Sequence, residues 1–473
     1  MKRVKTMTFF SPIFFIFLPV VAWVHYHLPG KHQYLWLLSA SLVFYLSGGP
    51  AFAAGLLVIS LITYGAVRGM EKSGPKRSAA FLAGAILLTI LMLVLFRYGA
   101  AAGDEASVLP ASWIPAGFSF YALTALGYVM DVYYGRTEPE HHFGRYLLFV
   151  AFFPSILSGP ILRADKMLPQ IREGRTFDYE KSRSGLYQML YGYLLKVLVA
   201  DRLAPMVAEA FDHYTVLSGA TLLWGAVLYG IQLYCDFAGY SAIALGAGRF
   251  LGYDLPVNFR QPYFAPSVAD FWHRWHISLS EWLRDEIYIP LGGNRKGKAR
   301  KMLNLMITFL VSGFWHGNGA NFLFWGGLHG AYQVAGKASP SRSVRPCLAR
   351  ILRCVRTFLL VDLAWIFFRA PSFRVGADYV YRIVTSFHLR TMTYYGEYLL
   401  GQAKGDLALI LLCILAVFVL DLLREKGYPV ASKIAGLPGL VRWALYLVLV
   451  LFMLLVSVRY YGEAASTFIY ARF

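Results

Sequence analysis

The sequence predicts an all-α integral membrane protein, on the grounds of its composition, its long uncharged runs and the placing of its basic residues. Of 473 residues, 58% are hydrophobic and 15% are charged, with a mean hydropathy of +0.51. Soluble chains carry about a quarter of their residues charged. In lipid, where no water is present, the backbone N–H and C=O groups of a helix hydrogen-bond to one another. Lipid is therefore the expected solvent for most of this chain.

Uncharged runs of the length that crosses a hydrocarbon core of about 30 Å predict the membrane spans. They lie at residues 6–24, 79–96, 214–235 and 443–458. Shorter or interrupted apolar stretches lie at 34–67, 146–162, 185–199, 302–315, 322–334, 358–368 and 407–420. We expect about ten to twelve crossings. Where a helix is interrupted at membrane depth, its free backbone N–H and C=O groups must bond to protein or to water in a cavity. The interruptions therefore predict an internal site.

The formal charge of +19 comes from short basic loops between the apolar runs. These loops contain Lys2, Arg3 and Lys5 and recur at 68–77, 163–183, 295–301, 342–356 and 424–433. The positive-inside rule places them in the cytosol, with anionic membrane lipids as partners and no nucleic acid. The basic start lacks a nearby small-residue cleavage site, so we interpret it as an uncleaved first span. Without repeats or linkers, residues 1–473 are predicted to form a single polytopic membrane domain.

Residues 258–301 form the most informative segment. Ser267 is expected to cap a helix, with Asp270 three residues on, and Pro290 ends the segment. Aromatic side chains share one face of this helix, whereas residues such as Arg274 make it too polar for a lipid-exposed span. We therefore predict an interfacial or re-entrant helix.

His316 follows the uncharged run 302–315 and precedes a glycine-rich apolar run, which places it near membrane depth. An ionisable residue there is a functional candidate, because its burial is costly. A neutral imidazole can take a proton at one nitrogen and be oriented through the other, as a general base for a hydroxyl requires. A structural histidine bonded to a neighbouring helix is the alternative, and both interpretations remain open at this point.

Other ionisable residues have more ordinary interpretations. His273 and His276 would share a helical face, but no HExxH pattern accompanies them, so we expect no metal. His329 either faces the cavity of His316 or packs there. Asp236, preceded by Tyr234, is expected to pair with a buried Arg or Tyr in preference to a substrate. Phosphate-loop and G-x-S-x-G patterns are missing, which argues against bound nucleotides and a serine hydrolase.

An ordered series of motifs runs through the middle of the chain. They occupy residues 115–121, 128–131, 153–154, 158–161, 236–241, 258–259, 262–263, 275–280, 289–294, 315–317 and 365–370. Their order and number resemble the membrane-bound O-acyltransferase family, within it the bacterial alginate O-acetyltransferase branch, over roughly residues 100–370. The family more often has Ser at Ala238, Asp at Ala242, Arg at His273 and Tyr at Glu286. These departures leave the Trp-His-Gly motif at 315–317 unchanged.

The resemblance implies a multi-span ring of helices, with re-entrant and interfacial helices, around a central funnel that leads to a catalytic histidine. His316 matches that histidine, and His276 matches the family's second one. The candidate substrate-binding residues are Asp236, Tyr234, Asn258, Trp315 and Arg369. The resemblance further implies a cytosolic acyl thioester donor such as acetyl-CoA or an acyl carrier, and no bound cofactor.

The predicted function is therefore acetyl transfer from a thioester to a hydroxyl of an exported polysaccharide, or to a periplasmic or surface partner protein that completes the transfer. The bacterial inner membrane is the expected location. In this hypothesis His316 is the general base, His276 orients a substrate or stabilises charge, and an oxyanion donor remains unidentified. The alternatives are D-alanyl or other acyl transfer to teichoic acid or another envelope acceptor, and a transporter or flippase without covalent chemistry.

Overall fold

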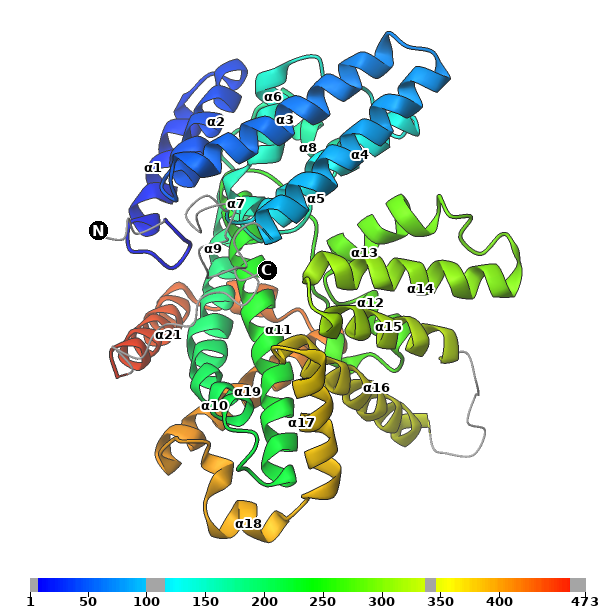
Figure 1. Ribbon diagram of the computed structural model, residues 1–473. Helices are drawn as coiled ribbons and strands as arrows, with labels where there is room; N and C mark the ends of the chain where they lie inside the picture. The colour runs from blue at the N-terminus through cyan, green and yellow to red at the C-terminus, as the bar shows by residue number, and fades with distance from the viewer. Residues whose placement is uncertain (1–6, 99–114, 337–345, 460–473) are drawn as a thin grey trace. The chain divides into compact units, whose positions relative to one another are not determined.

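The computed structural model describes residues 7–98, 115–336 and 346–459 (Figure 1). Every regular element within these ranges is a helix, as the sequence predicts. The basic residues Lys2, Arg3 and Lys5, and part of the predicted loop at 342–356, lie outside the described ranges.

The chain divides into two compact units. Unit 1 comprises Met1–Leu190 and Ser241–Val257, and unit 2 comprises Tyr191–Tyr240 and Asn258–Phe473. Helices α9 (Tyr179–Leu194) and α11 (Gly219–Phe250) contain two of the boundaries. The organisation of residues 1–473 as a single functional domain stays a prediction.

Unit 1 is a bundle of helices packed through aromatic rings. Its other helices are α1 (Phe14–His27), α2 (Gly30–Leu46), α3 (Pro50–Glu71), α4 (Pro75–Tyr98), α5 (Phe118–Tyr133), α6 (Phe143–Ala151), α7 (Phe153–Ile156) and α8 (Ala164–Glu173). The hydroxyls of Thr63 and Tyr146 lie 2.6 Å apart between α3 and α6. The Tyr45 ring contacts the Tyr121 ring edge-on at 5.8 Å, which joins α2 to α5. Such pairs add specific geometry to the burial of apolar surface.

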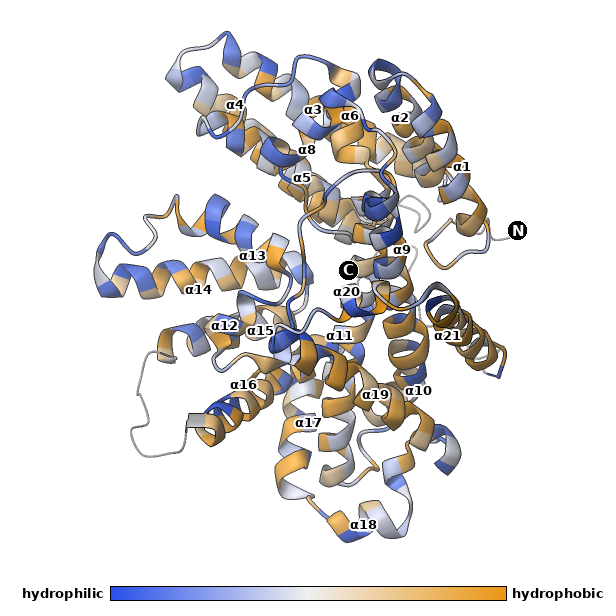
Figure 2. Ribbon diagram, turned by 180° about the vertical axis from the view of Figure 1, so that it is seen from behind, coloured by the Kyte–Doolittle hydropathy of each residue, from blue (hydrophilic) through white to orange (hydrophobic). Residues whose placement is uncertain are grey.

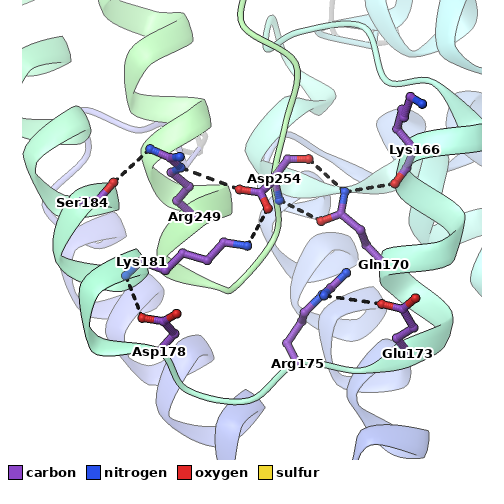
Figure 3. A network of polar contacts seen from close by, with 9 residues as sticks. All are labelled: Lys166, Gln170, Glu173, Arg175, Asp178, Lys181, Ser184, Arg249 and Asp254. Atoms are coloured by element: carbon purple, nitrogen blue, oxygen red, sulfur yellow. Dashed lines mark hydrogen bonds and ion pairs between the residues drawn. The ribbon is translucent and has the colours of Figure 1, made fainter.

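Polar contacts tie the segment after α11 to helices α8 and α9 (Figure 3). The Asp254 carboxylate forms an ion pair with the Lys181 ammonium at 2.7 Å. The side-chain amide of Gln170 donates a hydrogen bond to the Asp254 backbone oxygen and accepts one from the Asp254 N–H. A polar cavity of about 450 Å³ lies beside this network, within unit 1. Arg175, which lines the cavity, lies 3.6 Å from Glu173. The cavity therefore contains paired charges.

Unit 2 is built around the first part of α11, most of whose side chains are buried. Its other elements are η2 (Leu195–Ala200), α10 (Asp201–Asp212), η3 (Pro262–Phe264), α12 (Val268–Trp272), α13 (Ile277–Leu283), η4 (Arg284–Tyr288), α14 (Gly297–His316), α15 (Ala320–Ala335), α16 (Pro346–Arg369), α17 (Phe373–Thr385), α18 (Leu389–Tyr394), η5 (Glu397–Leu399), α19 (Lys404–Glu425), α20 (Val430–Ala435) and α21 (Gly439–Arg459). Of these, η2 and η4 are π-helical turns and η3 and η5 are 3₁₀ turns.

Four helices of the described part of the chain are long and apolar enough to cross a membrane: Ala51–Glu71, Pro75–Phe96, Lys404–Glu425 and Gly439–Arg459. The first belongs to the stretch predicted at 34–67, which is two helices, α2 and α3, separated at residues 47–49. Along α21, most large apolar side chains are exposed, and Figure 2 colours the helix as hydrophobic. Lipid is the solvent that such a surface fits.

Two of the runs predicted as spans differ from the structure. The run at 6–24 contains a helix only from Phe14, namely the 14-residue α1 with Pro19 inside it. The run at 214–235 falls largely in α11, which is not among the four helices because glycines and the polar Gln232 lower its hydropathy. Its side chains are mainly buried in protein. This uncharged run is therefore part of a helix that other helices largely enclose.

A carboxylate anchors the loop after α18. Glu397 accepts hydrogen bonds from the Ser218 hydroxyl at 2.6 Å, the Ser218 N–H at 3.1 Å and the Thr221 hydroxyl at 2.6 Å. Burial opposes ionisation, but these hydrogen bonds outweigh it and lower the pKa of Glu397. The carboxylate therefore stabilises the fold above the pKa of the unfolded chain, about 4.3, and this contribution is lost as the pH falls through the lower folded pKa.

We expect Glu397→Gln to lower the thermal unfolding midpoint of the detergent-solubilised protein at pH 7. When the pH is lowered below about 4.3, the unfolding midpoint of this variant is expected to decrease less than that of the wild type. Glu138→Gln, at an exposed carboxylate, is the control and should follow the wild type. Parallel pH profiles for Glu397→Gln and the wild type would contradict the assignment.

Candidate active site

A tight helical hairpin positions His316. Helix α14 ends at His316, and α15 begins four residues later and runs beside it (Figure 1). A Cβ atom at Gly313 would collide with the backbone of Phe322, and one at Gly326 with the backbone of Phe309. Because glycine alone permits this close approach, the two glycines set the spacing of the hairpin.

His316 is buried among aromatic rings, with only 2% of its surface exposed. Its ring centroid lies 4.7 Å from that of Trp315, 4.9 Å from that of Trp325 and 5.3 Å from that of Phe368. These rings come from α14, α15 and α16. Such a setting excludes water from the imidazole, and electrostatic interactions there are stronger than in water.

His276 lies in the turn between α12 and α13, with its backbone in the left-handed region at φ 45°. Such strain costs about 1–3 kcal/mol and persists where the surroundings impose it. The imidazole Nδ1 lies 3.2 Å from the side-chain oxygen of Asn258. This oxygen also accepts hydrogen bonds from the Ser278 N–H at 3.2 Å and from the Ser278 hydroxyl at 2.9 Å. Asn258 therefore holds the turn in place.

The contact with Asn258 also fixes the tautomer of His276. Because an amide oxygen only accepts hydrogen bonds, Nδ1 must carry the proton and donate it. Burial lowers the pKa of His276 to about 3, so the ring is neutral near pH 7. Its Nε2 atom then carries a lone pair. In this form His276 can accept a hydrogen bond from a hydroxyl.

The continuous helix predicted within 258–301 is wrong. Ser267 does cap a helix, since its hydroxyl accepts the Asp270 N–H at 3.1 Å, but α12 ends at Trp272. The chain turns at residues 273–276 because the Ile277 N–H bonds to the backbone oxygen of Asn258. His273 is exposed whereas His276 is buried, so the two imidazoles do not share a face.

Replacing Asn258 by Leu removes the oxygen that accepts hydrogen bonds from Ser278 and lies 3.2 Å from Nδ1 of His276. A hydrogen bond contributes about 0.5–1.5 kcal/mol, so we expect Asn258→Leu to lower the thermal unfolding midpoint and the activity together. Asn258→Asp keeps an acceptor oxygen at this place and should retain more of both. Thermal unfolding in detergent measures the first effect. A leucine variant as stable as the aspartate variant would contradict this role of Asn258.

Trp315 connects the two candidate histidines. Its ring centroid lies 4.7 Å from that of His316 and 6.2 Å from that of His276. Phe237 of α11 packs edge-on against His276 at 4.7 Å. The structure thus brings His276, His316, Trp315 and Asn258 into one neighbourhood of unit 2.

Asp236 belongs to a buried ion cluster. The Lys196 ammonium lies 2.7 Å from the carboxylate of Asp236 and 2.8 Å from that of Asp201, and all three side chains are at least nine-tenths buried. The sequence analysis expected an Arg or Tyr partner for Asp236 and did not single out Lys196. A lone cation inside the apolar stretch 185–199 was the signal that pointed to it.

The remaining predicted substrate-binding residues contact other carboxylates. The Tyr234 hydroxyl donates to Asp421 of α19 at 2.7 Å, and Asp421 also accepts a longer hydrogen bond from Tyr191 at 3.4 Å. Arg369, at the end of α16, lies 3.5 Å from Asp212. These contacts anchor α19 and the end of α16 within unit 2.

The sequence matches a known protein family over the part of the chain that contains His276 and His316. The model of the membrane-bound O-acyltransferase family matches residues 140–372. The chain is 35% identical over 391 residues to a probable alginate O-acetylase AlgI of Azotobacter vinelandii, which covers 78% of this chain and 76% of that protein. It is 32% identical over 412 residues to a peptidoglycan O-acetyltransferase of Helicobacter pylori, with 78% of each chain covered.

A teichoic acid D-alanyltransferase of Streptococcus thermophilus is 30% identical over 266 residues, which covers 51% of this chain and 60% of that protein. The family match falls on the part of the chain that holds His276, the α14–α15 hairpin and most of the predicted motifs. The chain therefore belongs to the membrane-bound O-acyltransferase family.

Proposed function

We propose that this O-acyltransferase moves an acetyl group from a cytosolic thioester, such as acetyl-CoA, to a hydroxyl of an exported polysaccharide at the bacterial inner membrane. A periplasmic or surface partner protein that completes the transfer is an alternative immediate acceptor. The observation that carries the proposal is the burial of His316 at the end of α14 among aromatic rings, one of which, Trp315, also contacts His276.

The comparisons favour an acetyl group over D-alanine. The relatives named for O-acetyl transfer cover 78% of this chain, whereas the D-alanyltransferase covers 51%. Their names concern alginate and peptidoglycan, both of which present hydroxyls outside the inner membrane. We therefore propose a cell-envelope or exported polysaccharide of this kind as the final acceptor.

The proposed reaction begins with His316 as general base. The neutral imidazole takes the proton of the acceptor hydroxyl while its oxygen attacks the thioester carbonyl carbon. The C–O bond forms and the carbonyl oxygen becomes an oxyanion. Collapse of this tetrahedral intermediate breaks the C–S bond, and the departing thiolate takes the proton from the imidazolium. Ester and free thiol are the products, so charge and protons balance.

His276 is proposed to orient the acceptor. Its Nδ1 proton is directed to Asn258, and its Nε2 lone pair can accept a hydrogen bond from a sugar hydroxyl. This supports the first of the two roles that the sequence analysis considered. Stabilising a developing negative charge would need a donor at Nε2, which the neutral tautomer lacks.

The decisive experiment uses the purified full chain in lipid nanodiscs, with acetyl-CoA and unacetylated alginate oligosaccharides. Free thiol is measured with a chromogenic disulfide, and acetyl ester by mass spectrometry. We expect thiol release that depends on the acceptor, with one ester formed per thiol. Presenting D-alanyl thioester in parallel tests the other acyl group. A transporter would move the donor into sealed vesicles without releasing thiol, and that result would overturn the proposal.

A further inference from the structure

A third buried histidine, His329, belongs to the same aromatic cluster as His316. It belongs to α15, four residues after Trp325, so the two side chains share a helical face. The Trp325 ring lies 4.9 Å from the ring of His316 and 5.0 Å from that of His329. Trp325 and His329 are each 0% exposed. One indole thus contacts both imidazoles.

Trp272 fixes the tautomer of His329. The indole N–H of Trp272 donates to Nδ1 of His329 at 3.2 Å. An indole nitrogen only donates, so Nδ1 must be the unprotonated nitrogen and the neutral ring carries its proton on Nε2. His329 therefore presents a donor, whereas His276 presents an acceptor. These two buried histidines of unit 2 thus present opposite hydrogen-bonding groups.

Two buried donors lie in this aromatic cluster, one on Trp325, whose ring contacts that of His316, and one on His329. Within the described ranges, neither His329 Nε2 nor the indole nitrogen of Trp325 has a hydrogen-bond partner, although both are enclosed by protein. An unsatisfied buried donor costs about 1–3 kcal/mol, and native proteins keep few of them. Both groups are N–H donors, so the chemistry that they require is an oxygen acceptor.

We propose that Trp325 and His329 bind the carbonyl oxygen of the acyl thioester and stabilise the oxyanion that forms when the acceptor attacks. The inference rests on the proposed acyl transfer, and it names the oxyanion donor which that reaction needs. Neutral N–H groups held in a dry site act strongly on a developing charge, because they need no reorganisation. Trp272 is a positioning residue, since it acts by holding the proton of His329 on Nε2.

The test compares variants that remove or keep each donor. Trp325→Phe removes the indole N–H but keeps an aromatic ring against both histidines. His329→Leu removes the imidazole donor, whereas His329→Gln retains an N–H donor of similar reach. Trp224→Phe is the matched control, because it removes an indole N–H that bonds to the backbone oxygen of Tyr398 in another part of unit 2.

Rates are measured per folded protein with acetyl-CoA and alginate oligosaccharides in nanodiscs. Trp325→Phe and His329→Leu are each expected to lower kcat by about 10²–10³-fold, with KM for acetyl-CoA changed by less than about threefold. His329→Gln should recover about tenfold or more of the loss at this position. Trp224→Phe should match the wild type. If His329→Leu does not fold, Trp325→Phe and His329→Gln carry the comparison.

An ordered water satisfying the same two donors would give a different pattern. Trp325→Phe and His329→Leu would then lower the unfolding midpoint but leave kcat within about threefold of the wild type, and this outcome would overturn the inference. A loss confined to KM would also overturn it. His316→Gln separates the two proposals. If His316→Gln is inactive while Trp325→Phe remains active, only the proposed oxyanion-binding role of Trp325 and His329 is rejected. An active His316→Gln rejects the proposed reaction itself.

Discussion

Replacing His316 by Gln is expected to reduce acetyl transfer by about 10²–10⁴-fold, the range that a general base contributes. Glutamine is close to histidine in size and keeps hydrogen-bonding groups among Trp315, Trp325 and Phe368, but it cannot take up a proton. His316→Ala should lose as much activity and more stability, because it leaves a cavity beside these rings. Acetyl ester on the exported polymer and thiol release by the purified protein both measure the effect.

His273→Ala is the matched control for the His316 variants. This histidine is exposed at the end of α12, so its removal should leave acetylation and membrane expression unchanged. Expression is compared on immunoblots of membranes before rates are normalised. Normal acetylation by a well-expressed His316→Gln protein would rule out His316 as the base.

Replacing Lys196 by Met is expected to destabilise unit 2 by about 3–5 kcal/mol, the cost of breaking a buried ion pair from one side. The variant keeps the length of the side chain but removes the ammonium that lies between Asp201 and Asp236. Two carboxylates would then share a nearly dry site, and like charges there repel strongly. The expected result is a large fall in the unfolding midpoint in detergent and poor accumulation in membranes.

Two further variants show whether the effect comes from burial of the charges. Lys166→Met removes a lysine with 80% of its side chain exposed, which pairs with Asp165 at 3.3 Å, and should change the midpoint little. Adding Asp236→Leu to Lys196→Met removes one of the stranded carboxylates and should restore part of the stability. If Lys196→Met shifts the midpoint no more than Lys166→Met does, the cluster does not stabilise unit 2 as inferred.

Composition and motif order were enough to predict the helical fold and the family, because both depend on residues adjacent in the chain, whereas the roles of His276 and His316 stay predictions. The spans at Pro75–Phe96 and Gly439–Arg459 follow from local hydropathy for the same reason. The run at 214–235 forms part of the long helix α11, whose side chains are buried mainly in protein, because burial in protein and burial in lipid favour the same uncharged sequence.

The break between α12 and α13 could not be predicted from local sequence patterns, because the residue that stabilises it is distant along the chain. Asn258, eighteen residues before His276, supplies the acceptor that holds the turn, and capping patterns within 267–290 carry no sign of it. The tautomers of His276 and His329 have a similar origin. Each is set by one partner, Asn258 or Trp272, whose distance from the imidazole only the tertiary fold determines.

The π-helical turn η2, which contains Lys196, lies immediately before α10. Such a turn holds an extra residue compared with α-helical winding. Deleting one residue between Leu195 and Ala200 would remove this extra residue and let the chain wind as a regular α-helix, with the following helix kept close to its present phase. Inserting a further residue into a regular α-helical turn would instead rotate every following position by about 100°. The π-helical turn thus absorbs one residue locally, so that Asp201 at the start of α10 still reaches the ammonium of Lys196.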